Sequence, residues 1–142
     1  MPSDPLPTGF LDQYKLMVEM ADRVSARRAL ANSFFVSVQS ALVAAVGFSS
    51  NDEWPLPIAG IVVAVAWWLS LRSYRMLNRA KFEVINRMEE RLPAQPYKDE
   101  WTALAQAEGP LHKRYAALSF VEQTVPVAFL ALNIILLVGA LD

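Results

Sequence analysis

Three long uncharged runs divide the chain and predict three membrane-spanning helices. They are Ala29–Asn51 with 23 residues, positions 54–71 with 18, and Gln123–Leu141 with 19. A helix that crosses a bilayer core of about 30 Å needs roughly 20 apolar residues. Neither glycine nor proline occurs in Phe10–Val46 or in Ile61–Leu92, so the first two spans continue as helices into charged sequence. We therefore expect an all-α membrane protein with three transmembrane helices, the first two extended into an antiparallel helical stalk.

Turn-forming residues set the expected boundaries between these elements. Glycine, proline and asparagine punctuate positions 47–57, and Pro93 and Pro96 end the second long helix. The expected segments are a tail at 1–10, a cytoplasmic helix at 11–28, the first span at 29–48, an outer turn at 49–56, the second span at 57–75, a cytoplasmic stalk helix at 76–92, a cytoplasmic connector at 93–120 and the third span at 121–141.

Apolar stripes on the two charged segments predict how the stalk is held together. Apolar residues recur at steps of three and four on both helices, which is typical of a helix with one packed face. The stripes comprise Tyr14, Met17, Ala21 and Val24 on the first helix and Leu77, Val84 or Ile85, Met88 and Leu92 on the second. The two stripes most simply pack on each other as a helical hairpin. Packing of each stripe on another subunit remains an alternative.

Basic residues predict the orientation in the membrane. All 13 Lys and Arg lie in Lys15–Arg28 and Arg72–Arg114, and none lies in the turn after the first span or after the third span. Cytoplasmic loops carry the excess of Lys and Arg. We expect a protein of the bacterial cytoplasmic (inner) membrane with its N-terminus inside and its C-terminus outside.

Composition narrows the chemistry further. The chain has 54% hydrophobic residues, a net charge of −1 and no cysteine, which excludes disulfides and thiolate chemistry. The first 28 residues lack the pattern of a signal peptide, so we expect the first span to be retained.

Polar residues within the spans form the most informative set. A polar group in hydrocarbon must find a partner in protein or water. Gln39 and Asn133 lie near the middle of their spans and are expected to hydrogen-bond, within or between subunits. Two interpretations of the polar face remain open: helix packing, or the lining of a pore shared among subunits. This intramembrane polar face comprises Asn32, Ser33, Ser37, Gln39, Ser40 and Asn133.

Catalytic and metal-binding groups are not indicated. His112 stands beside Lys113 and Arg114 and is expected to be a solvated loop residue. Glu89 and Glu90 are adjacent, so they point to different helix faces and are expected, with Glu83, to pair with stalk cations. We expect no enzyme activity, no cofactor and no metal ion.

A row of arginines begins where the second span ends. Arg72, Arg75 and Arg79 lie on one side of the helix, as expected for residues that bind anionic lipid headgroups at the bilayer surface. A nucleic-acid interface needs a broader basic patch with stacking aromatics, so we expect no nucleic-acid partner.

Two segments of the chain are similar to a known family. Tyr14–Phe35 and Leu77–Trp101 resemble the RipA family of octameric bacterial inner-membrane proteins. The matching residues are Lys81, Phe82, Val84, Ile85, Leu92, Pro93, Tyr97, Glu100 and Trp101. The resemblance implies a homo-oligomer of eight subunits without an established activity. The architecture is also similar to two-span effector modules of bacterial defence operons, which are thought to perforate membranes.

An aromatic segment after the proline break is expected to close the ring of subunits. Trp101 is a large apolar side chain in a polar stretch, and such residues are enriched at interfaces. We expect Tyr97 and Trp101 to dock near Phe82 and Ile85, either on a neighbouring subunit or on the same chain. The expected function is a non-enzymatic homo-oligomeric membrane assembly that presents a cytoplasmic helical ring to a protein partner. The alternative is an oligomeric channel or membrane effector.

Overall fold

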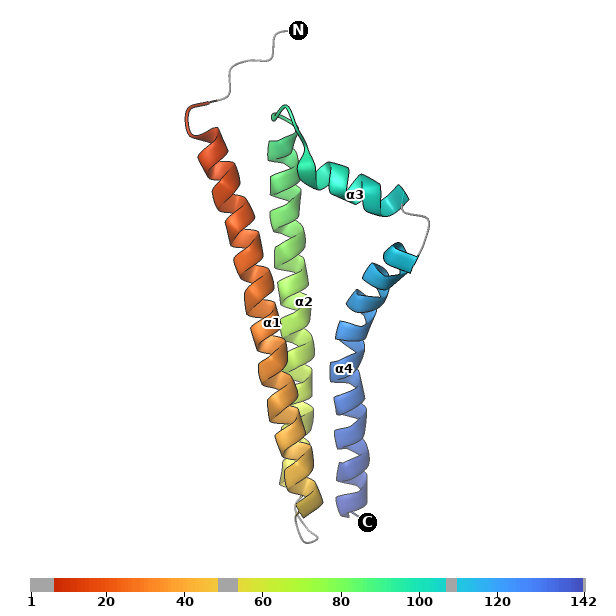
Figure 1. The fold of residues 1–142 in the computed structure, drawn as a ribbon. Helices are drawn as coiled ribbons and strands as arrows, with labels where there is room; N and C mark the ends of the chain where they lie inside the picture. The colour runs from red at the N-terminus through yellow and green to blue at the C-terminus, as the bar shows by residue number, and fades with distance from the viewer. Residues whose placement is uncertain (1–6, 49–53, 107–109, 142) are drawn as a thin grey trace.

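The computed structural model describes residues 7–48, 54–106 and 110–141, and the side chains of all of these except 101, 104, 105 and 110–120. Four helices account for these residues (Figure 1): α1 Phe10–Phe48, α2 Pro55–Glu89, α3 Pro96–Gln106 and α4 Pro110–Leu141. The apolar parts of α1, α2 and α4 are each long enough to cross a membrane. The all-α fold with three membrane-spanning helices is therefore confirmed.

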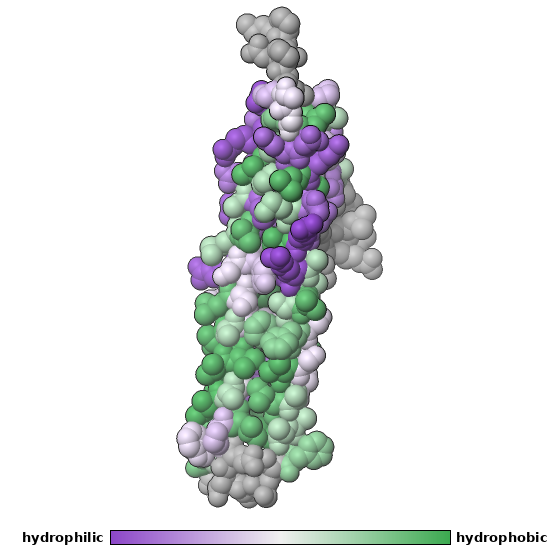
Figure 2. All heavy atoms as spheres, turned by 90° about the vertical axis from the view of Figure 1, so that its left-hand side faces the viewer, coloured by the Kyte–Doolittle hydropathy of each residue, from purple (hydrophilic) through white to green (hydrophobic). Residues whose placement is uncertain are grey.

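The long helices α1 and α2 form the expected antiparallel hairpin. They run side by side over their whole length, and α4 packs along the half of α2 that belongs to the span (Figure 1). Helix α3 branches from the far end of α2 and leads across to α4. The surface differs between the two ends of the molecule. Figure 2 shows that the span end is mainly hydrophobic and the stalk end mainly hydrophilic.

Glycine and proline set the ends of the hairpin. Gly9 has a φ of 84°, a conformation that glycine adopts freely, and the turn places the amide of Phe10 3.0 Å from the carbonyl of Pro7. Helix α2 ends at Glu89, four residues before Pro93, and helices usually end at or before the residue that precedes a proline. The amides of Arg91 and Leu92 close the last turn by donating to the carbonyls three residues earlier.

The stalk core contains part of the predicted stripes. Ala21, Val24 and Ile85 are buried between the helices, at 2%, 8% and 0% exposure. Leu77 and Val84 are exposed instead, at 48% and 39%. Of the two alternatives for the stripe, Ile85 is therefore the residue that packs in the hairpin, and Val84 is not. The prediction that Leu77 packs within the hairpin is wrong. A two-helix stalk encloses only a narrow strip of each helix, so the outer part of a wide apolar stripe stays uncovered.

Helix α2 is the central element of the span. In its most apolar stretch 28% of the residues are buried, compared with 6% in α1 and 11% in α4. The buried residues of α2 in this region include Gly60, Ala64, Trp67 and Leu71, which recur at three- and four-residue steps. The outer faces of all three helices are left to lipid or to other chains.

Candidate functional site

A cluster of buried polar groups joins the three spanning helices near the middle of the membrane. Gln39 of α1 and Asn133 of α4 are both fully buried. The Gln39 amide donates to the backbone carbonyl of Gly60 in α2 at 2.8 Å. The Asn133 amide donates to the side-chain oxygen of Gln39 at 3.1 Å and to the carbonyl of Phe129 at 2.8 Å. The predicted bond between Gln39 and Asn133 is therefore present, and it lies within one chain.

Gly60 is a position at which α2 closely approaches a side chain of α4. A Cβ atom on Gly60 would overlap the side-chain amide of Asn133. The Asn133 oxygen has no N–H or O–H donor, and it faces the Gly60 Cα, whose C–H group is a weak donor for a carbonyl oxygen. Exchanging the nitrogen and oxygen of Asn133 would place two acceptors against each other at Gln39, so the contacts fix the orientation of this amide.

A second polar cluster lies at the end of the span next to the stalk. Asn32 of α1 donates to the Glu122 carboxyl group at 2.7 Å and accepts from the indole N–H of Trp67 at 2.9 Å. Arg28 approaches the same Glu122 oxygen at 3.3 Å. Asn32 belongs to the predicted polar face, whereas Glu122, which directly precedes the third uncharged run, was not predicted to take part. The carboxyl group is largely enclosed, and its partners supply both hydrogen bonding and positive charge.

An aromatic layer packs between the two polar clusters. Trp67 stacks on Phe35 with ring centres 5.8 Å apart and planes 8° apart, and it meets Phe129 of α4 at 6.1 Å. Trp67 itself is 2% exposed. Since aromatic pairs of this kind contribute about 0.5–1.5 kcal/mol beyond simple burial, the layer reinforces the three-helix contact.

The predicted polar face of α1 divides into an inner and an outer set. Asn32 and Gln39 point into the chain, whereas Ser33, Ser37 and Ser40 are exposed. The hydroxyls of Ser33 and Ser37 donate to the carbonyls four residues earlier, Ala29 and Ser33. These bonds satisfy the hydroxyls within the helix, so the serines can face lipid, another helix or water.

Glu89 forms the junction of α1, α2 and α3. It is fully buried, and one oxygen accepts from the Tyr14 hydroxyl at 2.7 Å. The same oxygen accepts from the amide of Tyr97 at 3.1 Å, and the other accepts from the amide of Lys98 at 3.2 Å. These two amides belong to the first turn of α3, where they have no partner within the helix. Burial, and then the hydrogen bond to Glu89, raises the pKa of Tyr14 above its ordinary value.

The role predicted for Glu89 was wrong. It was expected to pair with stalk cations on the surface, as Glu83 does with Arg87 at 3.2 Å. Glu89 instead faces α1 and the start of α3, whereas the adjacent Glu90 is exposed. The sequence signal that could have found this role is Pro96 at the start of a short helix, seven residues after a carboxyl group on the inner face of α2.

The aromatic contact at the junction lies within the chain. Tyr97 meets Phe82 edge to face with ring centres 5.5 Å apart, and Ile85 is fully buried nearby on α2. Burial, and then the negative charge of Asp22, raises the pKa of Tyr97. The side chain of Trp101 lies outside the described residues, so a contact of this segment with a neighbouring subunit stays a prediction.

The arginine row leads from the span into the stalk. Arg72 lies over the ring of Trp68, with 5.9 Å from the guanidinium carbon to the ring centre. Arg72 and Arg79 are exposed, and Arg75 is half-buried with an interaction of its own. Binding of these side chains to lipid headgroups stays a prediction.

Metal-binding groups are not gathered in the part of the chain that the structure describes, where no three His, Asp or Glu residues come together. The side chain of His112 lies outside the described residues.

Comparison with known proteins gives one match over nearly the whole chain. The octameric membrane protein family (8xMP) matches residues 11–141, which include all three spans and the stalk. No curated protein and no solved structure matches the chain. A match of this extent agrees with the three spanning helices and with the expectation of a homo-oligomer. The chain belongs to the octameric membrane protein family.

Proposed function

We propose that this protein is a non-enzymatic, homo-oligomeric assembly of the bacterial cytoplasmic membrane whose helical stalks form a ring offered to a protein partner. The proposal places the N-terminus and the stalk in the cytoplasm and the C-terminus outside. This orientation rests on the partition of Lys and Arg between the two ends of the hairpin.

One observation favours an assembly platform over a channel. The mid-span amides Gln39 and Asn133 are both fully buried and bonded to each other. Groups engaged in this way hold three helices together inside the chain, away from the outer surfaces that could line a lumen. They support a structural role for the span.

The stalk supplies a surface that a soluble protein can reach. About 18 residues of each long helix lie outside its uncharged run. At 1.5 Å per residue this part of the helix is about 27 Å long. The headgroup layer covers only ~5–8 Å of this length. Arg72, Arg75 and Arg79 would hold the base of the stalk at the anionic surface.

Electrical recording tests the choice between platform and channel. The purified complex, reconstituted in planar bilayers of anionic lipid, should give no unitary conductance steps while it keeps its oligomeric mass. Conductance steps that depend on the protein would contradict the platform. In that case Ser37→Cys would locate the lumen, since a thiol reagent should block the current there.

A channel remains the second candidate because of one specific feature. Ser33, Ser37 and Ser40 are exposed on α1, away from the core of the single chain. A ring that turned these serines inward would have a weakly polar lumen. The bonds of Ser33 and Ser37 to helix carbonyls suit a packing role equally well.

Photo-crosslinking in living cells tests the presentation of the stalk. A photoreactive residue at Asn86, which is exposed on the stalk, should give an adduct of discrete mass with a protein other than this chain. The matched position Ile135 is exposed in the span and should give none. Only adducts with the chain itself at Asn86 would contradict a partner on the stalk.

A further inference from the structure

An uncovered apolar surface runs along α2 from the span into the stalk. Its residues are separated by three or four positions, or by seven at the end, which is the spacing of a helix–helix contact. We call this surface the α2 seam, and it comprises Val62, Ala66, Leu69, Ser73, Leu77 and Val84, all of them exposed. The largest are substantially uncovered, with exposures of 61% for Val62, 49% for Leu69 and 48% for Leu77.

Lipid can cover only part of the seam. Val84 is 12 positions beyond Arg72, which begins the charged segment, and so lies about 18 Å further along the helix. The headgroup layer is only ~5–8 Å thick. On the side of α1, which faces the viewer in Figure 2, the stalk end likewise carries hydrophobic side chains among hydrophilic ones. An apolar surface in water at this distance from the bilayer calls for a protein partner.

A matching surface exists on α1. Leu16, Met20, Leu30 and Phe34, here called the α1 row, fit the same seven-residue spacing, and their exposures are 55%, 42%, 73% and 61%. Arg23 and Arg27 occupy the positions between them, so the row is apolar near the end of the stalk and in the span, and basic in between. The row also extends from the span into the stalk.

The two surfaces also agree in depth. In each of the contacts Tyr14–Glu89, Asn32–Trp67 and Gln39–Gly60, a residue of α1 lies at the same depth as a residue of α2. The two residue numbers add up to about 100 in every case. By this rule Leu16 lies level with Val84, and Leu30 lies level with Leu69. Copies related by rotation about an axis normal to the membrane keep the same depth, so these residues can meet between neighbours.

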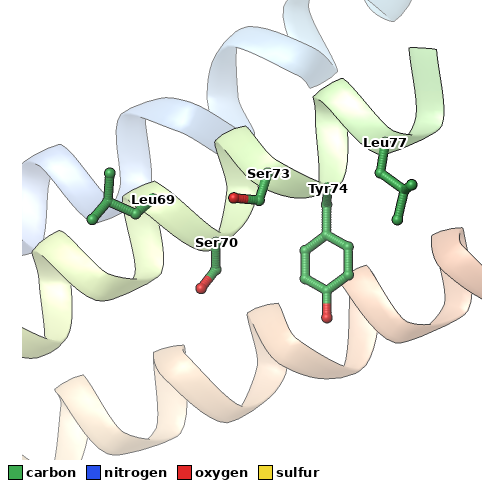
Figure 3. Close-up of a pocket in the computed structure, with 5 residues that line it drawn as sticks. All are labelled: Leu69, Ser70, Ser73, Tyr74 and Leu77. Atoms are coloured by element: carbon green, nitrogen blue, oxygen red, sulfur yellow. The ribbon is translucent and has the colours of Figure 1, made fainter. Parts of the chain in front are cut away.

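A hollow on the seam offers a place for an incoming side chain. It has a volume of about 380 Å³ and is lined by Leu69, Ser70, Ser73, Tyr74 and Leu77. In Figure 3, Ser70 and Tyr74 point toward the ribbon of α1, while α4 lies on the opposite side of α2. None of the described residues of the same chain fills the hollow. Leu30, the most exposed member of the α1 row, is at the matching depth.

We propose that the α2 seam of one chain binds the α1 row of a second copy of the same chain. Closed rings form when one patch meets a different patch on the next subunit, and the seam and the row are two such patches. The partner is a second copy because the family is octameric and because a partner for the whole seam needs apolar residues both within and beyond the bilayer. The inference rests on the proposed homo-oligomeric function and identifies the surface that carries it.

Cysteine pairs divided between two co-expressed chains test this contact directly, because the chain has no cysteine of its own. One chain carries Leu16→Cys and the other Val84→Cys, and the second pair is Leu30→Cys with Leu69→Cys. After oxidation with copper phenanthroline in isolated membranes, each pair should give a disulfide-linked dimer. A disulfide across one chain cannot form in this arrangement.

Matched controls vary the face and the depth separately. Lys15→Cys with Val84→Cys keeps the depth but changes the face of α1, and Leu16→Cys with Leu69→Cys keeps the faces but changes the depth. Neither control should give a dimer. Dimers from both controls, or from Val84→Cys alone, would overturn the proposed pairing.

The mass of the complex separates failure of the contact from failure of the proposed function. Matched pairs that give no dimer in a complex of full oligomeric mass would overturn the seam and leave the assembly standing. A chain that is monomeric in the membrane would overturn both. As an independent measurement, Val84→Glu should reduce the mass of the complex, whereas Asn86→Glu, on another exposed face, should not. An unchanged mass for Val84→Glu would contradict the proposal.

Discussion

The side-chain amide of Asn133 donates a hydrogen bond to the side-chain oxygen of Gln39 across 94 positions of the chain, at 3.1 Å and out of reach of solvent. Gln39→Leu and Asn133→Leu should each lower the thermal stability, because either change leaves its partner without a bond. Interhelical bonds of this kind contribute ~0.6 kcal/mol on average and up to ~1.7. The double variant should therefore lose less than the sum of the two single variants.

Thermal unfolding of the four chains in detergent, combined as a double-mutant cycle, measures this coupling. Ser37→Ala is the matched control, since Ser37 is exposed on the same helix. Strictly additive losses would show that the two amides do not depend on each other.

Gly60→Ala should destabilise the span by about 1–3 kcal/mol, the usual cost of overpacking. The new Cβ would overlap the Asn133 amide, which its bonds to Gln39 and Phe129 hold in place. Gly139→Ala is the control, because a Cβ there has no neighbouring atom within 4 Å. Replacing Asn133 with alanine in the Gly60→Ala background should recover part of the loss. Equal melting temperatures for Gly60→Ala and Gly139→Ala would contradict the close approach of α2 and α4.

Removing the contact between Tyr14 and Glu89 should loosen the far end of the stalk. Tyr14→Phe takes away one donor, and Glu89→Gln replaces an oxygen that accepts amide hydrogens with a group that repels them. Each change should cost about 1–3 kcal/mol. Hydrogen exchange of α3, followed by mass spectrometry, should become faster in both variants. Glu90→Gln, which alters the exposed neighbour, should leave this exchange unchanged, and a similar rise there would argue against a specific role for Glu89.

Single cysteines can establish the orientation of the chain. Leu141→Cys should react with an impermeant thiol reagent added outside intact cells, and Gln95→Cys should react only after the cells are opened. The reason is the complete absence of Lys and Arg after the third span, in contrast to the basic stalk. Labelling of Gln95→Cys in intact cells would contradict the proposed orientation.

The span was predictable from the sequence because a bilayer imposes simple rules. An uncharged run of sufficient length becomes a helix, and an amide within it must find a partner, so both the three helices and the Gln39–Asn133 bond could be predicted. The partner of Glu122 and the role of Gly60 depend on which helix faces meet, which a single sequence does not encode directly.

The stalk was less predictable because it stands in water, where several arrangements satisfy the same residues. Glu89 and Glu90 look alike in the sequence, and only the position of α3 makes one a buried acceptor and the other a surface group. Leu77 belongs to an apolar stripe wider than one partner helix can cover. Its exposure in the single chain is what the proposed contact with a second copy would explain.

The proposed ring and the contact between the α2 seam and the α1 row both depend on self-association in the membrane. Native mass spectrometry of the complex, released in mild detergent from membranes that contain the unmodified chain, tests it most directly. Membership of an octameric family predicts a principal species of eight times the 15.8 kDa chain mass, with bound lipid. A principal species at the mass of one chain, under conditions that keep the helices folded, would contradict the account.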